Sequence, residues 1–516
     1  MKENSRTKNT VFNISSNVLI YFIKTILSFI TRTVFIKVLG ELYLGVNGLL
    51  TNVLSMLSLA ELGISSAISF SLYKPLAEND NKQVSILMSF FKKVYSIIGL
   101  IVFILGIILF FFLDKIIPEY NQIKNIGIIY FLYLINTVST YYIAYKEILI
   151  TADQKSYRLT KINVFFTSIF YIMQIIILLI FKNFISYLVV QFFIQIVQKI
   201  ITNKFITKEY SEIDYNIKEK LPESTSNEIK KNVKAMFLHK IGDYCINGTD
   251  NIIISKFINV VTVGLYSNYL TLINMINAII TMIYNNITAS FGNLLVRENK
   301  EKSLEIFKKL DFSAFILYSF CGILFANLGN IFINIWIGEK YLLDQITVIL
   351  LSFSFFFTGT RNASSVVRNA AGLYDKDKFV PIIQSIINLI ISIVLSINMG
   401  INGVILGTII SSILPCFYRS YILYKNIFKD DYLKYLKEYY IKYILFFIFD
   451  LLLIVYVSNK IKINGILGLL VLALVSIILY SIGIIIVFRN YKEFKYLKEL
   501  FKNLLEKVKL KINVRS

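Results

Sequence analysis

The sequence predicts an all-α integral membrane protein with about 14 transmembrane helices. The expected architecture is two pseudo-symmetric six-helix lobes around a central cavity, followed by a C-terminal helix pair. Three observations lead to this prediction. Hydrophobic residues make up 56% of the 516-residue chain, long apolar segments recur along all of it, and its two halves resemble each other. A soluble core of this size would not need so apolar a composition.

The expected elements follow from the length of the apolar segments. A bilayer core about 30 Å thick is crossed by roughly 20 helical residues. The expected spans lie near residues 10–37, 45–72, 84–113, 124–150, 159–181, 184–206, 233–257, 262–295, 309–335, 346–373, 379–399, 401–425, 440–458 and 463–488. The expected organisation is an N-terminal lobe (1–206), a cytoplasmic linker (207–232), a C-terminal lobe (233–430), a helix pair (431–490) and a basic amphipathic tail (491–516).

The two lobes match at equivalent points. Phe-Ile-Lys before Gly45 resembles Ile-Ser-Lys before Gly264, at the turn after the first span of each lobe. Thr-Ala at residues 151–152 resembles Ala-Ala at residues 370–371, at the end of the fourth span and with the same offset. Internal repeats of this kind are common in transporters, so they favour a six-plus-six arrangement.

The distribution of charge predicts the orientation. The chain has 54 Lys and Arg, 32 Asp and Glu, and a formal net charge of +22. Most cations fall in loops on one side of the expected spans, so the positive-inside rule places both termini in the cytoplasm. Because the cations are dispersed, nucleic acid is not an expected partner. The basic tail is expected to contact anionic membrane lipids. Richness in Ile, Asn, Lys and Tyr indicates a low-GC bacterial genome, so the expected location is a bacterial cytoplasmic membrane.

The first expected span carries polar residues at helical spacing. Asn13, Asn17, Lys24, Ser28 and Arg32 fall on one face. A cation in the centre of a bilayer costs about 2.5 kcal/mol or more, so this face is expected to meet water or a polar ligand. Two alternatives stay open, because Lys24 could snorkel and Arg32 could reach lipid headgroups.

Three further spans have comparable polar faces. The seventh carries His239, Lys240, Asp243 and Asp250; the eighth carries Asn274 and Asn277; the tenth carries Arg361 and Arg368. Four such faces are enough to line the hydrated, mostly cationic chamber of a transporter. Two simpler interpretations remain. His239 and Asp243 could hydrogen-bond to each other without contacting cargo, and the asparagines could serve only as hydrogen bonds between helices.

These residue types indicate a cargo. Arginine forks match phosphate oxygens, lysine supplies a compact charge, and amides suit the hydroxyl groups of sugars. The expected cargo contacts are Lys24, Arg32, His239, Lys240, Asn274, Asn277, Arg361 and Arg368. A sugar carried on a lipid pyrophosphate satisfies both chemistries while its tail stays in the bilayer. A soluble anion would also fit.

The intramembrane acids are candidates for energy coupling. Glu61, Asp243 and Asp250 could bind H⁺ or Na⁺ and bias one transport state. Glu61 could instead pair structurally with a basic residue, and Asp250 could be interfacial. The isolated cysteines Cys245, Cys321 and Cys416 have no metal-ligand spacing. No catalytic residue, metal site or resident cofactor is expected.

Several segments resemble a known family. The segments are residues 32–40, 44–48 and 59–67 in the first half and residues 250–257, 263–269 and 370–372 in the second. They resemble bacterial polysaccharide flippases of the multidrug/oligosaccharidyl-lipid/polysaccharide exporter (MOP) superfamily. The resemblance implies export of undecaprenyl-pyrophosphate-linked oligosaccharide repeat units by alternating access, for a capsule, an O-antigen or another surface polymer. It also implies a cationic cavity to which Lys24 and Arg32 contribute, and a polysaccharide polymerase is a conceivable partner.

Departures from the pattern separate the relatives. No Asp or Glu lies between Glu3 and Glu41, whereas cation-coupled multidrug exporters commonly use an acid in the first span. The peptidoglycan lipid-precursor flippase is a closer alternative, but its densely arginine-lined first two spans are only partly reproduced, since the second span here carries Glu61 and no Arg. A membrane glycosyltransferase or polysaccharide polymerase would need a sizeable outer loop, and the expected outer loops are short. The chain is therefore not expected to be an enzyme.

Overall fold

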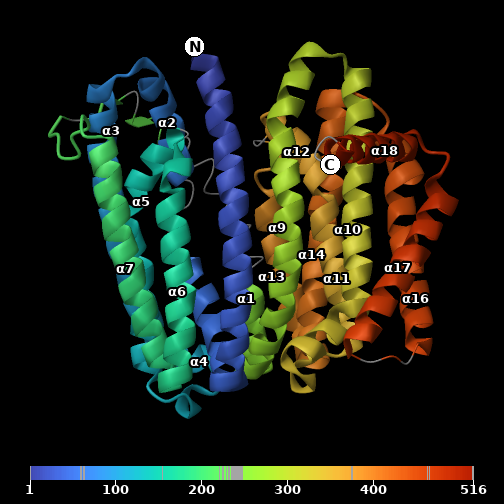
Figure 1. The fold of residues 1–516 in the computed structure, drawn as a ribbon, viewed down its shortest axis with the longest axis horizontal. Coiled ribbons are helices and arrows are strands. Elements are labelled where there is room, and N and C mark those ends of the chain that lie inside the picture. Colours follow the sequence, from blue (N-terminus) through green and yellow to red (C-terminus); the bar gives the residue numbers. More distant parts are fainter. Residues whose placement is uncertain are drawn as a thin grey trace. The chain divides into compact units, whose positions relative to one another are not determined.

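The computed structural model describes residues 2–513 except for 58–60, 62–63, 154, 220, 224–225, 228, 230–232, 234–247, 374–375, 462 and 464. Within helices, the side chains of residues 2–19, 66–67, 70, 286, 289–290, 293, 296, 504–505 and 507–513 are also outside the description. The described chain forms two compact units, Met1–Ser267 and Asn268–Ser516. Each unit is built almost wholly from helices (Figure 1).

The first unit contains the N-terminal helices. They are α1 (Lys2–Leu57), α2 (Ile64–Glu78), α3 (Asn81–Phe110), α4 (Leu113–Ile116), α5 (Ile126–Ala152), α6 (Thr160–Phe181) and α7 (Phe184–Glu209), with short 3₁₀ turns at Tyr120–Gln122 and Ser156–Leu159. Helix α9 (Val260–Arg297) begins in this unit and continues in the second. Polar side chains begin two of the helices, since Asp80 accepts from the Gln83 amide at α3 and Asn183 from the Ile185 amide at α7.

The second unit contains the remaining helices. They are α10 (Lys300–Ile337), α11 (Gln345–Thr360), α12 (Asn362–Ala370), α13 (Val380–Met399), α14 (Ile401–Leu423), α15 (Tyr432–Tyr435), α16 (Ile441–Lys460), α17 (Gly465–Phe488) and α18 (Lys492–Asn513), with a 3₁₀ turn at Glu339–Tyr341 and π-helical turns at Tyr424–Phe428 and Leu436–Tyr440. Helix α18 runs across the direction of the long helices of its unit (Figure 1).

Helix α1 is broken where the sequence predicts a turn between two spans. Gly40 has φ 82° and ψ −170°, a backbone conformation that favours glycine. Shortly after it, Gly45 packs against the start of α9, and a Cβ on Gly45 would lie 2.0 Å from the Val260 carbonyl oxygen. A Cβ on Gly264 would lie 2.9 Å from the Gly45 nitrogen. The two glycines that the sequence comparison equates therefore contact each other.

A buried polar seam joins α16 and α17, the C-terminal helix pair, to α10 of the same unit. The Asn327 amide of α10 donates to Ser458 of α16 and to Ser476 of α17, at 2.8 Å each. The hydroxyls of Ser319 and Tyr480 are 2.6 Å apart. Such hydrogen bonds hold apolar helices together where hydrophobic burial gives little preference.

Eleven helices in the described part of the chain are long and apolar enough to cross a membrane. They correspond to the third to sixth and the eighth to fourteenth expected spans, so the prediction of a multi-pass all-helical membrane protein is confirmed. The expected spans near 10–37 and 45–72 fall largely on α1 and α2. The span near 233–257 lies mostly outside the described residues, and the total of about 14 helices stays a prediction.

Candidate functional site

A chain of polar contacts connects three helices of the second unit. The Tyr318 hydroxyl of α10 donates to Asn277 Oδ1 of α9 at 2.9 Å and accepts from Asn362 Nδ2 of α12 at 2.5 Å. Gly359 makes this placement feasible, because a Cβ there would lie 1.9 Å from the Tyr318 ring. Thr281 also donates to Asn277, at 3.3 Å. These amides and hydroxyls form a connected polar surface inside a membrane unit.

Arg361 lies at the junction between α11 and α12, next to this polar chain. Its Nη1 donates to Gln384 Oε1 at a long 3.3 Å, and no described carboxylate forms a salt bridge with it. Its side chain is partly exposed. The guanidinium therefore has donors that an anionic ligand could use.

Arg368 lies in a buried ion network. Its Nη1 pairs with Asp377 Oδ2, and the same oxygen accepts from Arg419 Nε of α14 at 3.1 Å. Arg419 also donates to Ser365, and Arg368 donates to Asn369 at 2.8 Å. The Asp377 side chain is fully buried. Two arginines thus share the buried Asp377 carboxylate.

The polar residues of α9 divide into two environments. Asn277 is held by Tyr318 and Thr281, whereas Asn274 is exposed one turn earlier. The structure therefore brings Asn277 together with Asn362 beside Arg361 and leaves Asn274 outside that network.

The first unit holds the basic residues predicted on the first span. Arg32 of α1 is partly buried, and its Nη2 donates to Ser267 Oγ of α9 at 2.6 Å. Lys24, two turns earlier on the same helix, is exposed. Arg32 is thus oriented by a neutral hydroxyl, and Lys24 is accessible.

The predicted coupling acids have structural neighbours. Glu61 accepts a hydrogen bond from the Tyr95 hydroxyl at 2.8 Å. Asp250 is buried beside the Tyr266 hydroxyl. His239, Lys240 and Asp243 lie outside the described residues. Coupling and cargo roles for all these residues stay predictions.

Sequence reasoning missed three members of the second-unit site. Arg419 is a charge inside the apolar twelfth expected span, a signal that could have identified it. Asp377 belongs to a polar loop between spans, and nothing in the local sequence marks it as buried. Tyr318 resembles the many other tyrosines of the chain, and only the fold reveals its two amide partners.

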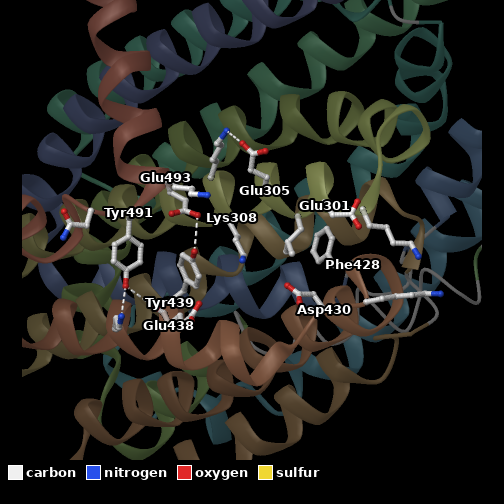
Figure 2. A pocket seen from close by; sticks show the side chains of 16 residues that line it. Glu301, Glu305, Lys308, Phe428, Asp430, Glu438, Tyr439, Tyr491 and Glu493 are labelled. Carbon is white, nitrogen blue, oxygen red and sulfur yellow. Dashed lines mark hydrogen bonds and ion pairs between the residues drawn. The ribbon is translucent and has the colours of Figure 1, made fainter.

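A separate open pocket of about 720 Å³ lies in the second unit between α10, α18 and the turns preceding α16 (Figure 2). None of the predicted cargo residues lines it. Many of its charged groups are already engaged: Glu305 accepts from Lys309 at 2.6 Å, and Glu493 and Tyr439 point toward each other. This mixed-charge pocket is distinct from the arginine and amide site.

The fold defines the class of protein. The structure named "Lipid II flippase MurJ, inward closed conformation" matches with a TM-score of 0.62 and 16% identity, over 92% of this chain and 98% of that one. A mutant of the Vibrio cholerae MATE transporter VcmN matches with a TM-score of 0.58 and 11% identity, over 83% and 100%. An inward-facing multidrug resistance MATE family transporter of the MOP superfamily matches with a TM-score of 0.59 and 12% identity, over 79% and 94%. The chain therefore has the MOP transporter fold.

The sequence identifies the family within that class. The family described as "Polysaccharide biosynthesis protein" matches residues 10–289, more than half of the chain, and the chain belongs to this family. No curated protein sequence matches it. The family match and the MOP fold agree with the resemblance that the sequence predicted, and with a transporter in place of an enzyme.

Proposed function

We propose that this protein is a flippase for undecaprenyl-pyrophosphate-linked oligosaccharide repeat units. It carries them from the inner to the outer face of a bacterial cytoplasmic membrane by alternating access, and the product serves capsule, O-antigen or related surface polysaccharide synthesis. The polysaccharide biosynthesis family and the MOP fold support a lipid-linked cargo. Both termini are proposed to be cytoplasmic, and the full fold to contain two six-helix lobes with an added helix pair.

The observation that carries this proposal is the pairing of two chemistries in one unit. Arg361 offers guanidinium donors that no described carboxylate occupies, and it lies between α11 and α12, close in sequence to Arg368 and its buried ion network. The amides of Asn277 and Asn362 lie beside them through Tyr318. A pyrophosphate requires the first group of donors and a sugar the second.

Lys24 and Arg32 are the proposed contributions of the first unit. Lys24 is exposed and Arg32 is fixed by Ser267, so both carry positive charge that can attract an anionic head group. Asn274, His239 and Lys240 are proposed as further cargo contacts. Glu61, Asp243 and Asp250 are proposed as sites where H⁺ or Na⁺ acts on the transport cycle.

A second candidate is a peptidoglycan lipid-precursor flippase. The observation that favours it is the similarity of the fold to a lipid II flippase over 92% of this chain. Both candidates carry a sugar on a polyprenyl pyrophosphate, so the same site would serve either cargo.

Competition in proteoliposomes separates the candidates. The translocation of a labelled lipid-linked oligosaccharide is measured with unlabelled oligosaccharide lipid, lipid II or a cationic dye as competitor. The proposal predicts strong competition by oligosaccharide lipid and weak competition by the other two. Preferential competition by lipid II would favour the second candidate, and export of the dye without lipid translocation would refute both.

A further inference from the structure

A buried carboxylate lies in the C-terminal helix pair, away from the arginine and amide site. Asp450 of α16 is 2% exposed, and its Oδ2 has no hydrogen-bond partner in the described part of the chain. No described lysine, arginine or histidine forms a salt bridge with it. An ionised carboxylate in such a place has neither water nor a counter-charge to stabilise it.

The carboxylate occupies a recess made by a glycine. A Cβ on Gly483 of α17 would lie 2.9 Å from Asp450 Oδ1 and 3.2 Å from the Phe446 ring. Any larger residue at position 483 would compete with the carboxylate for this space. The acid is therefore accommodated by the close packing of α16 on α17 at Gly483.

The neighbouring helices supply few titratable groups. From α17, Tyr480 interacts with Asp450, and its hydroxyl is already bonded to Ser319 of α10 and to the Ile316 carbonyl oxygen. From α10, Cys321 interacts with Tyr480. From α11, Phe353 and Phe356 pack against Phe447 of α16. None of these groups supplies a positive charge to Asp450.

These surroundings favour a proton over a metal cation. Hard metal cations take about six oxygen ligands, and no cluster of three or more His, Cys, Asp or Glu occurs among the described residues. A proton needs only the one carboxylate. It makes the buried acid neutral and removes the cost of an isolated charge.

We propose that Asp450 is a proton-binding site of this transporter and that the proton it holds is coupled to cargo movement, an inference that rests on the proposed function. Burial favours the protonated acid, so release of the proton requires water to reach Asp450. A ligand stabilises the state that binds it better. Proton binding therefore stabilises the state in which α10, α16 and α17 are packed together. Proton release stabilises a state in which water reaches Asp450 between these helices.

The site is tested first without cargo. Infrared absorption of protonated carboxyl groups is followed through a pH titration of the purified protein in lipid nanodiscs, for wild type and Asp450→Asn. The expected difference is one carboxylic-acid band that is present at acidic pH, disappears as the pH is raised and is absent from the variant. Asp450→Glu should shift that band, which provides a second test if the Asn variant is poorly folded. The proposal would be overturned if the band is the same in wild type and in both variants. A band that does not respond to pH would also overturn it.

Coupling is tested in sealed proteoliposomes with lipid-linked oligosaccharide. An imposed pH gradient should change the wild-type translocation rate several-fold and leave the Asp450→Asn rate unchanged. Asp344→Asn is the control, since Asp344 is an exposed acid at the start of α11. A wild-type response to the gradient in Asp450→Asn would refute coupling at this residue. If the wild-type protein translocates no cargo, the proposed function is refuted. The infrared titration then still tests whether Asp450 binds a proton.

Discussion

At the scale of single residues, Arg361 and Arg368 have different surroundings although the sequence places them on one helical face. Arg361 has one long contact to a neutral amide, whereas Arg368 is buried against Asp377. An arginine that is paired with a buried carboxylate binds an anionic ligand more weakly than an arginine whose N–H donors face no carboxylate. We therefore expect the two arginines to differ when they are substituted.

Arg361→Ala should lower the rate of cargo translocation about 10- to 100-fold, the effect of losing charge-assisted hydrogen bonds worth about 1.5–3 kcal/mol. Arg361→Lys should retain part of the rate, because lysine keeps the positive charge but lacks the forked N–H donors of the guanidinium. Initial rates in proteoliposomes at equal protein density test this. Wild-type rates in Arg361→Ala would remove this residue from the cargo site.

Asp377→Asn should destabilise the second unit by about 3–5 kcal/mol, because it leaves two arginines without their shared counter-charge. Thermal unfolding of the detergent-solubilised protein measures the effect. Asp344→Asn is the control, since Asp344 is exposed and its side chain makes no capping hydrogen bond at the start of α11. Equal melting temperatures for Asp377→Asn and wild type would contradict a stabilising network.

At the scale of helices, the close crossing of α1 and α9 depends on two glycines. Gly45→Ala should destabilise the first unit by about 1–3 kcal/mol through overpacking, since its Cβ would meet the Val260 carbonyl. Gly99→Ala is a matched control, because a Cβ there would make an ordinary 3.5 Å contact with Tyr141. If the Gly45→Ala protein is as stable as the control, α1 and α9 can move apart at little cost, and the prediction is contradicted.

Apolar length predicts helices well in this protein, and side-chain partners much less well. Eleven expected spans have counterparts because roughly 20 apolar residues can cross a bilayer only as a helix. The break at Gly40 was also predictable from the turn pattern before Gly45. The partners of Arg368 were not, because Asp377 reaches it only through a loop fold that no periodicity encodes. Asp450 could have been found by the same signal as Arg419, since it is a single charge within an apolar span.

At the scale of the whole molecule, the charge distribution predicts the orientation in the membrane. In a variant whose native cysteines are replaced by serine, Gln122→Cys should react with an impermeant maleimide added to intact cells. Lys218→Cys should react only after the cells are permeabilised. Both positions are exposed, so accessibility reports the side of the membrane. The reverse pattern would contradict cytoplasmic termini.

The central claim is that a cationic and amide-lined site moves a lipid-linked oligosaccharide across the membrane. The most direct measurement is the accessibility of the sugar head group to an impermeant lectin in sealed proteoliposomes, for wild type and Lys24→Ala/Arg361→Ala. Arg368 is kept, because it holds Asp377. The control is Lys93→Ala/Lys498→Ala, which removes two exposed lysines outside the proposed site.

The account predicts that wild type and control expose the head group at similar rates and that the Lys24→Ala/Arg361→Ala protein does so at least tenfold more slowly at equal abundance. Equal rates in all three proteins would contradict the assigned site. No movement of the head group by wild type would contradict the flippase itself.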